Sequence, residues 1–142
     1  MKIERAAVND YSRIVNVWES SVKATHHFLK TEDFEYYKKI MPTDFFPNVD
    51  LYILRVKKRI VGFIGVSEEN LEMLFVEEDS IGKGYGKILL NYAIQELNVK
   101  RLDVNEQNVQ AIGFYEKFGF KIAGRSEKDS MNKDYPILHL IR

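Results

Sequence analysis

Three glycines alternate with two lysines and a tyrosine in the segment Gly82-Lys83-Gly84-Tyr85-Gly86-Lys87. The apolar run 71–76 before it is typical of a buried strand, and residues 87–97 after it carry apolar side chains at helical spacing. A glycine-rich turn that opens a helix binds anions, because its backbone N–H groups and the positive end of the helix dipole point at the ligand. Lys83 and Lys87 add positive charge. We therefore expect residues 82–87 to bind a phosphate or pyrophosphate group.

Two widespread phosphate-binding loops do not fit this spacing. A nucleoside-triphosphate loop needs glycine at Ile81 and Ser or Thr at Ile88. The G-x-G-x-x-G pattern needs glycine at Lys87 or Leu89. On these residues alone, a tight strand-to-helix connection without a ligand also remains open.

Size, charge and cysteine content limit the other classes of function. The chain has 142 residues, which favours one domain spanning 1–142, and its 21 basic and 21 acidic residues give no net charge. We therefore expect neither a nucleic acid nor a membrane as a partner. The absence of cysteine excludes disulfides and thiol-based zinc sites, and no metal is expected. The N-terminus lacks a signal-like apolar stretch, so the expected location is cytoplasmic. The expected oligomeric state is a monomer or a homodimer.

Hydrophobic periodicity and helix-capping residues predict the elements around the loop. Thr31 is the expected N-cap of the second helix, and Pro42 its expected end. Strands are predicted at 2–6, 51–56, 60–66, 71–76, 101–104, 120–123 and 136–141, and helices at 11–22, 31–41, 87–97 and 108–118. This order predicts an α/β (α+β) fold whose mixed central sheet has about six or seven strands and about four flanking helices. The crossover through the glycine loop must be parallel and right-handed.

A second informative segment spans residues 105–120. Its distinctive residues, after the glycine loop, are Asn108, Ala111, Phe114-Tyr115 and Gly119-Phe120. This order and spacing resemble the GNAT superfamily of acetyl-CoA-dependent N-acetyltransferases, over essentially the whole chain. Residues 21–29, Gly124-Arg125-Ser126 and Tyr135-Pro136 resemble a small bacterial branch proposed to acetylate protein lysines. One position departs from the pattern, because Ile81 stands where the family usually has an Arg or Gln that can donate to a pyrophosphate.

The resemblance implies acetyl-CoA as cofactor and a primary amine as acceptor, either a protein lysine or a small molecule. It places the coenzyme A diphosphate on residues 82–87 and the pantetheine arm along the backbone of Leu74 and Val76, as an added strand. The N–H of Leu74 would polarise the thioester carbonyl. Asn108 would contact the pantetheine or pyrophosphate, or act only as the N-cap of its helix.

The resemblance also assigns catalytic roles. Tyr115 would donate a proton or a hydrogen bond to the leaving thiolate. Glu72 lies two residues before Leu74, on the same face of a regular strand, and is the expected base. His26 and His27 are rival bases. An acyl-CoA-binding sensor that does not transfer the acyl group remains an alternative, as does an acetyltransferase for a small-molecule amine.

Overall fold

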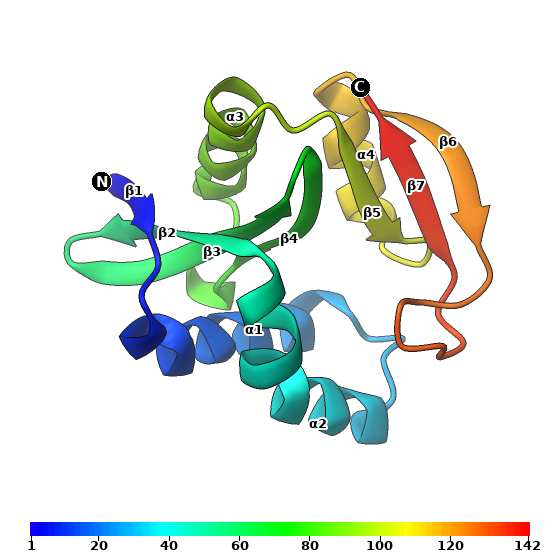
Figure 1. Cartoon of the computed structure of the whole chain (residues 1–142), viewed down its shortest axis with the longest axis horizontal. Coiled ribbons are helices and arrows are strands. Elements are labelled where there is room, and N and C mark those ends of the chain that lie inside the picture. Colours follow the sequence, from blue (N-terminus) through cyan, green and yellow to red (C-terminus); the bar gives the residue numbers. More distant parts are fainter.

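The computed structural model describes all residues, 1–142, and contains a seven-stranded sheet in the order β1-β2-β3-β4-β5-β7-β6 with four α-helices (Figure 1). The strands are β1 (Lys2–Arg5), β2 (Asp50–Val56), β3 (Arg59–Ser67), β4 (Asn70–Val76), β5 (Arg101–Asn105), β6 (Lys121–Ser126) and β7 (Ile137–Ile141). The helices are α1 (Tyr11–Thr25), α2 (Thr31–Ile40), α3 (Tyr85–Leu97) and α4 (Val109–Lys117). The predicted α+β class, mixed sheet and helix number are confirmed. None of the helices is long and apolar enough to cross a membrane.

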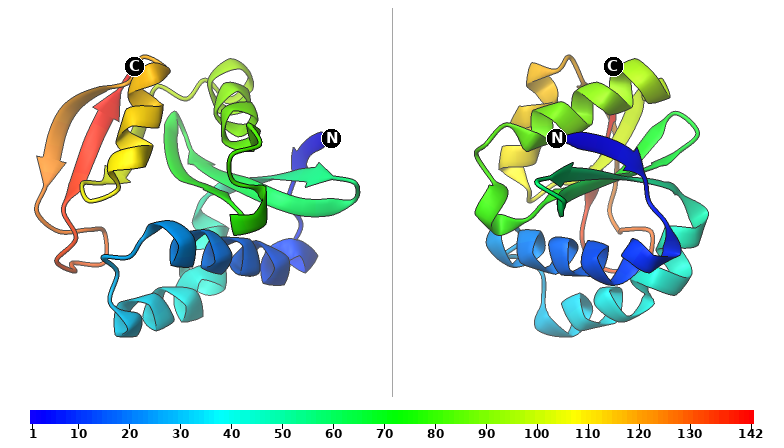
Figure 2. Two further views of the ribbon diagram at one scale, coloured as in Figure 1. Left: turned by 180° about the vertical axis from the view of Figure 1, so that it is seen from behind. Right: turned by 90° about the vertical axis from the view of Figure 1, so that its left-hand side faces the viewer.

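The sheet separates two hydrophobic clusters. Helix α1 covers one face of the first half of the sheet and buries Ile14 and Trp18 against it, and α2 packs beside α1 through the stacked rings of Phe34 and Trp18. Helix α3 covers the opposite face and buries Leu89 and Leu90 against it. Helix α4 packs on the second half of the sheet, β5-β7-β6, and leaves the other face of these strands without a helix (Figures 1 and 2). Helices therefore cover both faces of the first half of the sheet, which contains β4.

Three predicted boundaries differ from the structure. The N-cap of α2 is Lys30 rather than Thr31, because the Lys30 carbonyl already accepts from the Phe34 N–H at 2.9 Å. The chain also does not stop at Pro42 but continues in a wide helical turn, Met41–Phe45, in which proline occupies a first-turn position that needs no N–H donor. Strand β6 extends to Ser126, which pairs with β7.

The parallel pair β4 and β5 separates almost at once. Their only paired residues are Asn70 with Arg101 and Leu71 with Leu102. Beyond that point the two halves of the sheet diverge like the arms of a V, with α3 and α4 on the same side of the opening (Figure 2). The edge of β4 from Met73 to Val76 consequently has no strand beside it.

A β-bulge lies where the separation begins. In the β3–β4 ladder Gly65 is opposite Met73 and Val66 is opposite Leu71, so Glu72 is the extra residue. Leu71 and Leu74, three residues apart, both pack in the cluster under α3. The regular alternation from which Glu72 was assigned to the face of Leu74 is therefore wrong at this point, because the bulge interrupts it.

Candidate functional site

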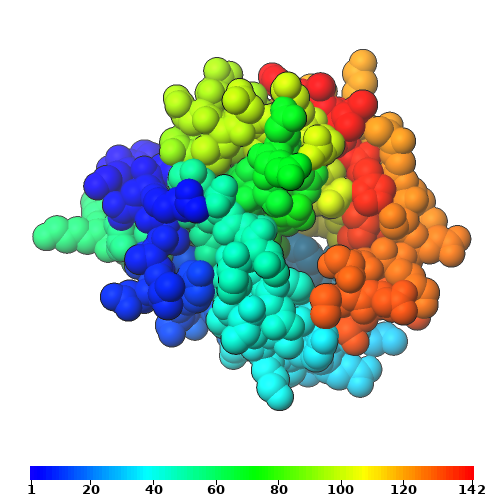
Figure 3. Space-filling model, in the orientation of Figure 1, coloured from blue at the N-terminus to red at the C-terminus, as the bar shows by residue number.

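A cleft of about 540 Å³ occupies the gap between β4 and β5. The predicted site residues that line it are Glu72, Leu74, Val76, Gly82, Gly84, Tyr85, Gly86, Lys87, Asn108, Tyr115 and His26. Lys83 and His27 do not line the cleft. A hollow of the surface is visible in Figure 3 between the green β3–β4 turn and the orange connection from β6 to β7. The fold thus gathers into one cavity residues that are far apart in the sequence, such as His26 and Tyr115, which are 89 positions apart.

The glycine loop forms the mouth of the cleft. Gly82 and Gly84 have φ values of 87° and 85°, a left-handed conformation that glycine adopts without strain. Helix α3 begins at Tyr85, and its first intrahelical donor is Ile88, whose N–H bonds to the Gly84 carbonyl at 3.2 Å. The six backbone N–H groups of residues 82–87 have no acceptor in the protein. Six free donors at a helix N-terminus, with Lys87 beside them, fit a diphosphate.

The open edge of β4 offers further backbone groups. The N–H of Glu77 donates to Val61 of β3 at 2.9 Å, so the odd-numbered residues Phe75 and Met73 also direct their N–H and C=O groups toward β3. The groups of Val76 and Leu74 alternate with these and point into the gap, where no strand pairs with them. This arrangement fits an extended ligand with amide groups, such as a pantetheine arm.

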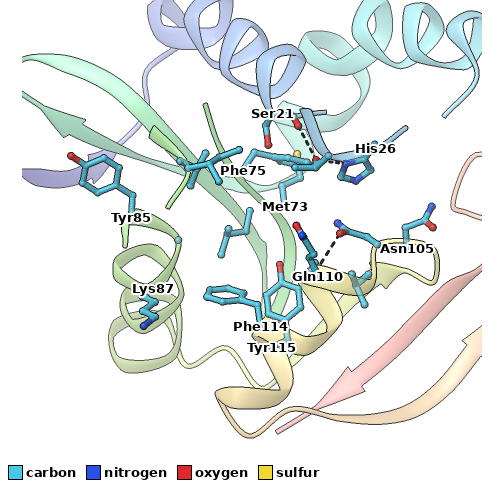
Figure 4. A pocket seen from close by; sticks show the side chains of 18 of the residues that line it. Ser21, His26, Met73, Phe75, Tyr85, Lys87, Asn105, Gln110, Phe114 and Tyr115 are labelled. Carbon is cyan, nitrogen blue, oxygen red and sulfur yellow. Dashed lines mark hydrogen bonds between the residues drawn. The ribbon is translucent and has the colours of Figure 1, made fainter. Parts of the chain in front are cut away.

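Tyr115 reaches the cleft from α4. The residue is 8% exposed, and its ring packs near Phe114, at 5.4 Å between ring centroids, and near Phe120, at 6.1 Å. The hydroxyl points into the cavity, where it has no protein hydrogen-bond partner (Figure 4). Burial raises the pKa of this phenol well above its ordinary value. Tyr115 therefore keeps its proton at neutral pH and can donate a hydrogen bond.

Asn108 is confirmed as the N-cap of α4. Its Oδ1 accepts a hydrogen bond from the Ala111 N–H at 3.3 Å. The same side chain lines the cleft. The contact of Asn108 with the cofactor stays a prediction, since the capping bond uses only one lone pair of the amide oxygen.

His26 lies at the end of α1, with Nδ1 2.7 Å from the Thr25 Oγ1. The Thr25 hydroxyl donates to the Ser21 carbonyl at 2.8 Å, so its oxygen accepts from Nδ1–H. The proton-free nitrogen of His26 is therefore Nε2. Burial, assisted by the charge of His27, lowers the pKa of His26 to about 4. His26 is uncharged at neutral pH and is only a weak base.

This shift predicts an acid-sensitive fold. The pKa of His26 rises from about 4 in the folded chain to its ordinary value of about 6.5 on unfolding, so between these values the unfolded state binds more protons. The free energy of unfolding should fall by about 2–3 kcal/mol as the pH drops from 6.5 to 4. Urea unfolding at pH 7 and pH 4.5 measures it. His26→Gln should lose much of this dependence, whereas the exposed His27→Gln should keep most of it. Equal pH dependence in wild type and His26→Gln would contradict the assignment.

Two ion pairs to the buried carboxylate of Glu77 hold the exit of β4 toward the loop. Glu77 directly follows the strand, and its side chain is 4% exposed. Arg13 of α1 donates to Glu77 Oε2 at 2.7 Å and to the Ile60 carbonyl at 2.8 Å. Arg59 approaches Oε1 to 2.8 Å as an ion pair without hydrogen-bond alignment. The triad ties α1, β3 and the start of the loop together, and sequence reasoning did not identify it.

Asp103 is a second residue that sequence reasoning missed. It lines the cleft from β5, between the buried Leu102 and Val104. Asp103 and Glu72 directly follow Leu102 and Leu71, the last paired residues of the two parallel strands. Both carboxylates therefore lie at the vertex of the V, and no lysine or arginine pairs with either. In the sequence, Asp103 is only a charged residue between two apolar ones. This alternation is equally typical of any strand with one face in solvent, so it did not mark Asp103 as a site residue.

The two ends of the cleft thus differ in charge. Free N–H groups and Lys87 lie at its mouth, and two carboxylates lie at its vertex. Such a cavity fits a molecule with a phosphate end that extends past Leu74 to meet a cationic partner.

Comparison with known proteins agrees with this geometry. Residues 16–132 match the acetyltransferase (GNAT) domain. The chain is 37% identical over 142 residues to the peptidyl-lysine N-acetyltransferase YjaB of Salmonella typhimurium, which covers 99% of this chain and 97% of that protein. It is 36% identical over 141 residues to YjaB of Escherichia coli, covering 99% and 95%.

Solved structures give the same result. The solution structure of the apo form of Escherichia coli YjaB superimposes with a TM-score of 0.89 at 36% identity, over 99% of this chain and 95% of that one. The PaiA N-acetyltransferase of Thermoplasma acidophilum, crystallised with coenzyme A, superimposes with a TM-score of 0.76 at 21% identity over the whole of both chains, which shows the shared fold. The chain therefore belongs to the GNAT family and is an N-acetyltransferase that uses acetyl-CoA.

Proposed function

We propose that this N-acetyltransferase acetylates the side-chain amine of lysine residues in proteins or peptides. The observation that carries the proposal is the polarity of the cleft, with free N–H donors at the mouth and the carboxylates of Glu72 and Asp103 at the vertex. A lysine side chain ends in a cation of reference pKa about 10.4, which carboxylates attract. The names of the YjaB proteins, peptidyl-lysine N-acetyltransferases, support the same acceptor.

Different residues of the cleft bind the cofactor and stabilise the groups that react. Bound acetyl-CoA supplies an acetyl group activated as a thioester. The donors of residues 82–87 hold its diphosphate, and the backbone of Leu74 and Val76 holds its extended arm. The acceptor nitrogen forms the new C–N bond as the C–S bond breaks. The Leu74 N–H stabilises the oxyanion that develops on the carbonyl oxygen, and Tyr115 donates a hydrogen bond to the departing sulfur.

Glu72 takes the proton that the acceptor nitrogen loses, directly or through water. The bulge supports this role, because it projects the residue into the cleft at the point where β4 and β5 part. His26 is the second candidate, through its proton-free Nε2. Its lowered pKa of about 4 makes it the weaker choice.

The test is release of free coenzyme A thiol from acetyl-CoA in the presence of defined acceptors. A lysine-containing peptide should give steady thiol release, with one acetyl group on the ε-nitrogen by mass spectrometry. The matched control is the same peptide with its lysine already acetylated, which should give only the background rate. Release with a polyamine or an aminoglycoside, but not with the peptide, would contradict the lysine proposal and favour a small-molecule acceptor.

A further inference from the structure

Three side chains from three neighbouring strands form a hydrogen-bonded chain that ends in the cleft. His139 of β7 places Nδ1 2.6 Å from Asp103 Oδ1 and Nε2 2.7 Å from the Ser126 hydroxyl. The three residues lie on β5, β7 and β6, which are adjacent in the sheet. They occupy the face of these strands that no helix covers, since Leu102 and Val104 turn the opposite way into the core (Figure 1).

The direction of the two bonds follows from their chemistry. An ionised carboxylate only accepts, so His139 donates Nδ1–H to Asp103. In the neutral imidazole, Nε2 accepts a hydrogen bond from the Ser126 hydroxyl, and in the imidazolium Nε2–H donates to the same oxygen, so the contact with Ser126 is made in either form. The close approach of β6 supports the ring, because a Cβ at Gly124 would lie 3.7 Å from His139 Cδ2. The Asp103 carboxylate thus determines that Nδ1 of His139 carries a proton, and the bond to Ser126 holds the imidazole ring in line with Asp103.

The bond to His139 uses only one oxygen of Asp103. Oδ2 has no partner in the protein, and the side chain is 39% exposed where it lines the cleft. Asp103 stands beside Leu102, level with Glu72 across the vertex. A carboxylate held by one oxygen and open at the other is suited to accept a hydrogen bond from a cation.

We propose that Asp103 binds the ammonium group of the incoming acceptor and that His139 and Ser126 are positioning residues for it. This inference rests on the proposed transfer to an amine. It adds the group that recognises the charge of the acceptor. The class of acceptor that Asp103 selects is a protonated primary amine on a flexible chain, in preference to an uncharged nitrogen nucleophile. Glu72 receives the proton after Asp103 has placed the amine.

The test compares a charged with an uncharged acceptor. Nα-acetyl-lysine methylamide carries one ammonium group, whereas O-methylhydroxylamine is an uncharged amine at neutral pH. Asp103→Asn should raise KM for the lysine amide at least about tenfold, the usual scale for losing a hydrogen bond to a charged group. KM for O-methylhydroxylamine should stay within about twofold, because no charge is recognised. The matched control is Asp50→Asn, which removes the same charge from a β2 carboxylate that does not line the cleft.

Variants of His139 test whether this residue orients Asp103 through its hydrogen bond or only fills space beside it. His139→Asn keeps an N–H donor near the place of Nδ1 and should retain KM for the lysine amide within about threefold. His139→Leu fills similar space without a donor and should behave like Asp103→Asn. Titration calorimetry with coenzyme A should give the wild-type affinity for all of these variants, which verifies that the cleft has folded.

Three results would overturn the inference. The first is an unchanged KM for the lysine amide in Asp103→Asn. The second is an equal rise in KM for both acceptors, which would indicate a distorted cleft. The third is an equal rise in KM for the lysine amide in His139→Asn and His139→Leu. If the wild-type enzyme acetylates no amine in this series, the proposed function fails and the inference fails with it, whereas the first three results leave the proposed function intact.

Discussion

Replacement of Tyr115 by Phe should lower kcat about 10- to 100-fold and leave the dissociation constant for coenzyme A within about twofold. The hydroxyl is the group that changes, and it has no protein partner whose loss would disturb the fold. A hydrogen bond to a developing thiolate is stronger in the transition state than in the ground state, so its loss appears in kcat. Because burial raises the pKa of Tyr115, the phenol is protonated at neutral pH, where the effect should be measured.

Steady-state kinetics and calorimetry with coenzyme A measure the two quantities separately. The matched control is Tyr92→Phe, which removes a hydroxyl from a half-buried tyrosine of α3 that does not line the cleft. Tyr92→Phe should retain wild-type kcat. A Tyr115→Phe enzyme with wild-type turnover would remove this residue from the reaction and leave it a packing role beside Phe114.

Replacement of Gly84 by Val should weaken coenzyme A binding about 10- to 100-fold. Gly84 has φ of 85°, and a β-branched residue in this left-handed conformation costs about 1–2 kcal/mol or forces the turn to rearrange. Rearrangement would redirect the N–H groups of residues 82–87, which lack any other acceptor. Space is not the cause, since a Cβ at Gly84 would meet no atom within 4 Å.

Gly113→Val is the matched control. Gly113 lies in α4 with helical backbone, and a Cβ there also meets nothing within 4 Å. This variant should bind coenzyme A like wild type. Equal dissociation constants for the two valine variants, measured by calorimetry, would mean that the left-handed turn is not needed to bind the diphosphate.

Local residue patterns were sufficient to predict the elements of the fold. The order of seven strands and four helices follows from two periodicities, and the cap at Asn108 and the left-handed Gly119 follow from the chemistry of helix ends. The glycine loop was also legible in the sequence. Its function depends on backbone donors, and alternating glycines at the start of a helix determine those donors locally.

The side chains around the reacting atoms were only partly predictable. Tyr115, Glu72 and His26 were placed near the cleft through the family resemblance, and all three line it. Lys83 was expected to contribute but lies outside the lining. A lysine in an exposed turn has no local feature that fixes the direction of its long side chain.

The sequence alone determined which segments are helices and strands, where the anion-binding turn lies and which family the chain joins, because each depends on residues close together along the chain. Only the tertiary structure decided the bulge at Glu72, the early parting of β4 from β5 and the meeting of Asp103 with His139, 36 residues away. Strand register and the facing of side chains are set by packing between distant segments. A period of two residues along one strand does not contain that information.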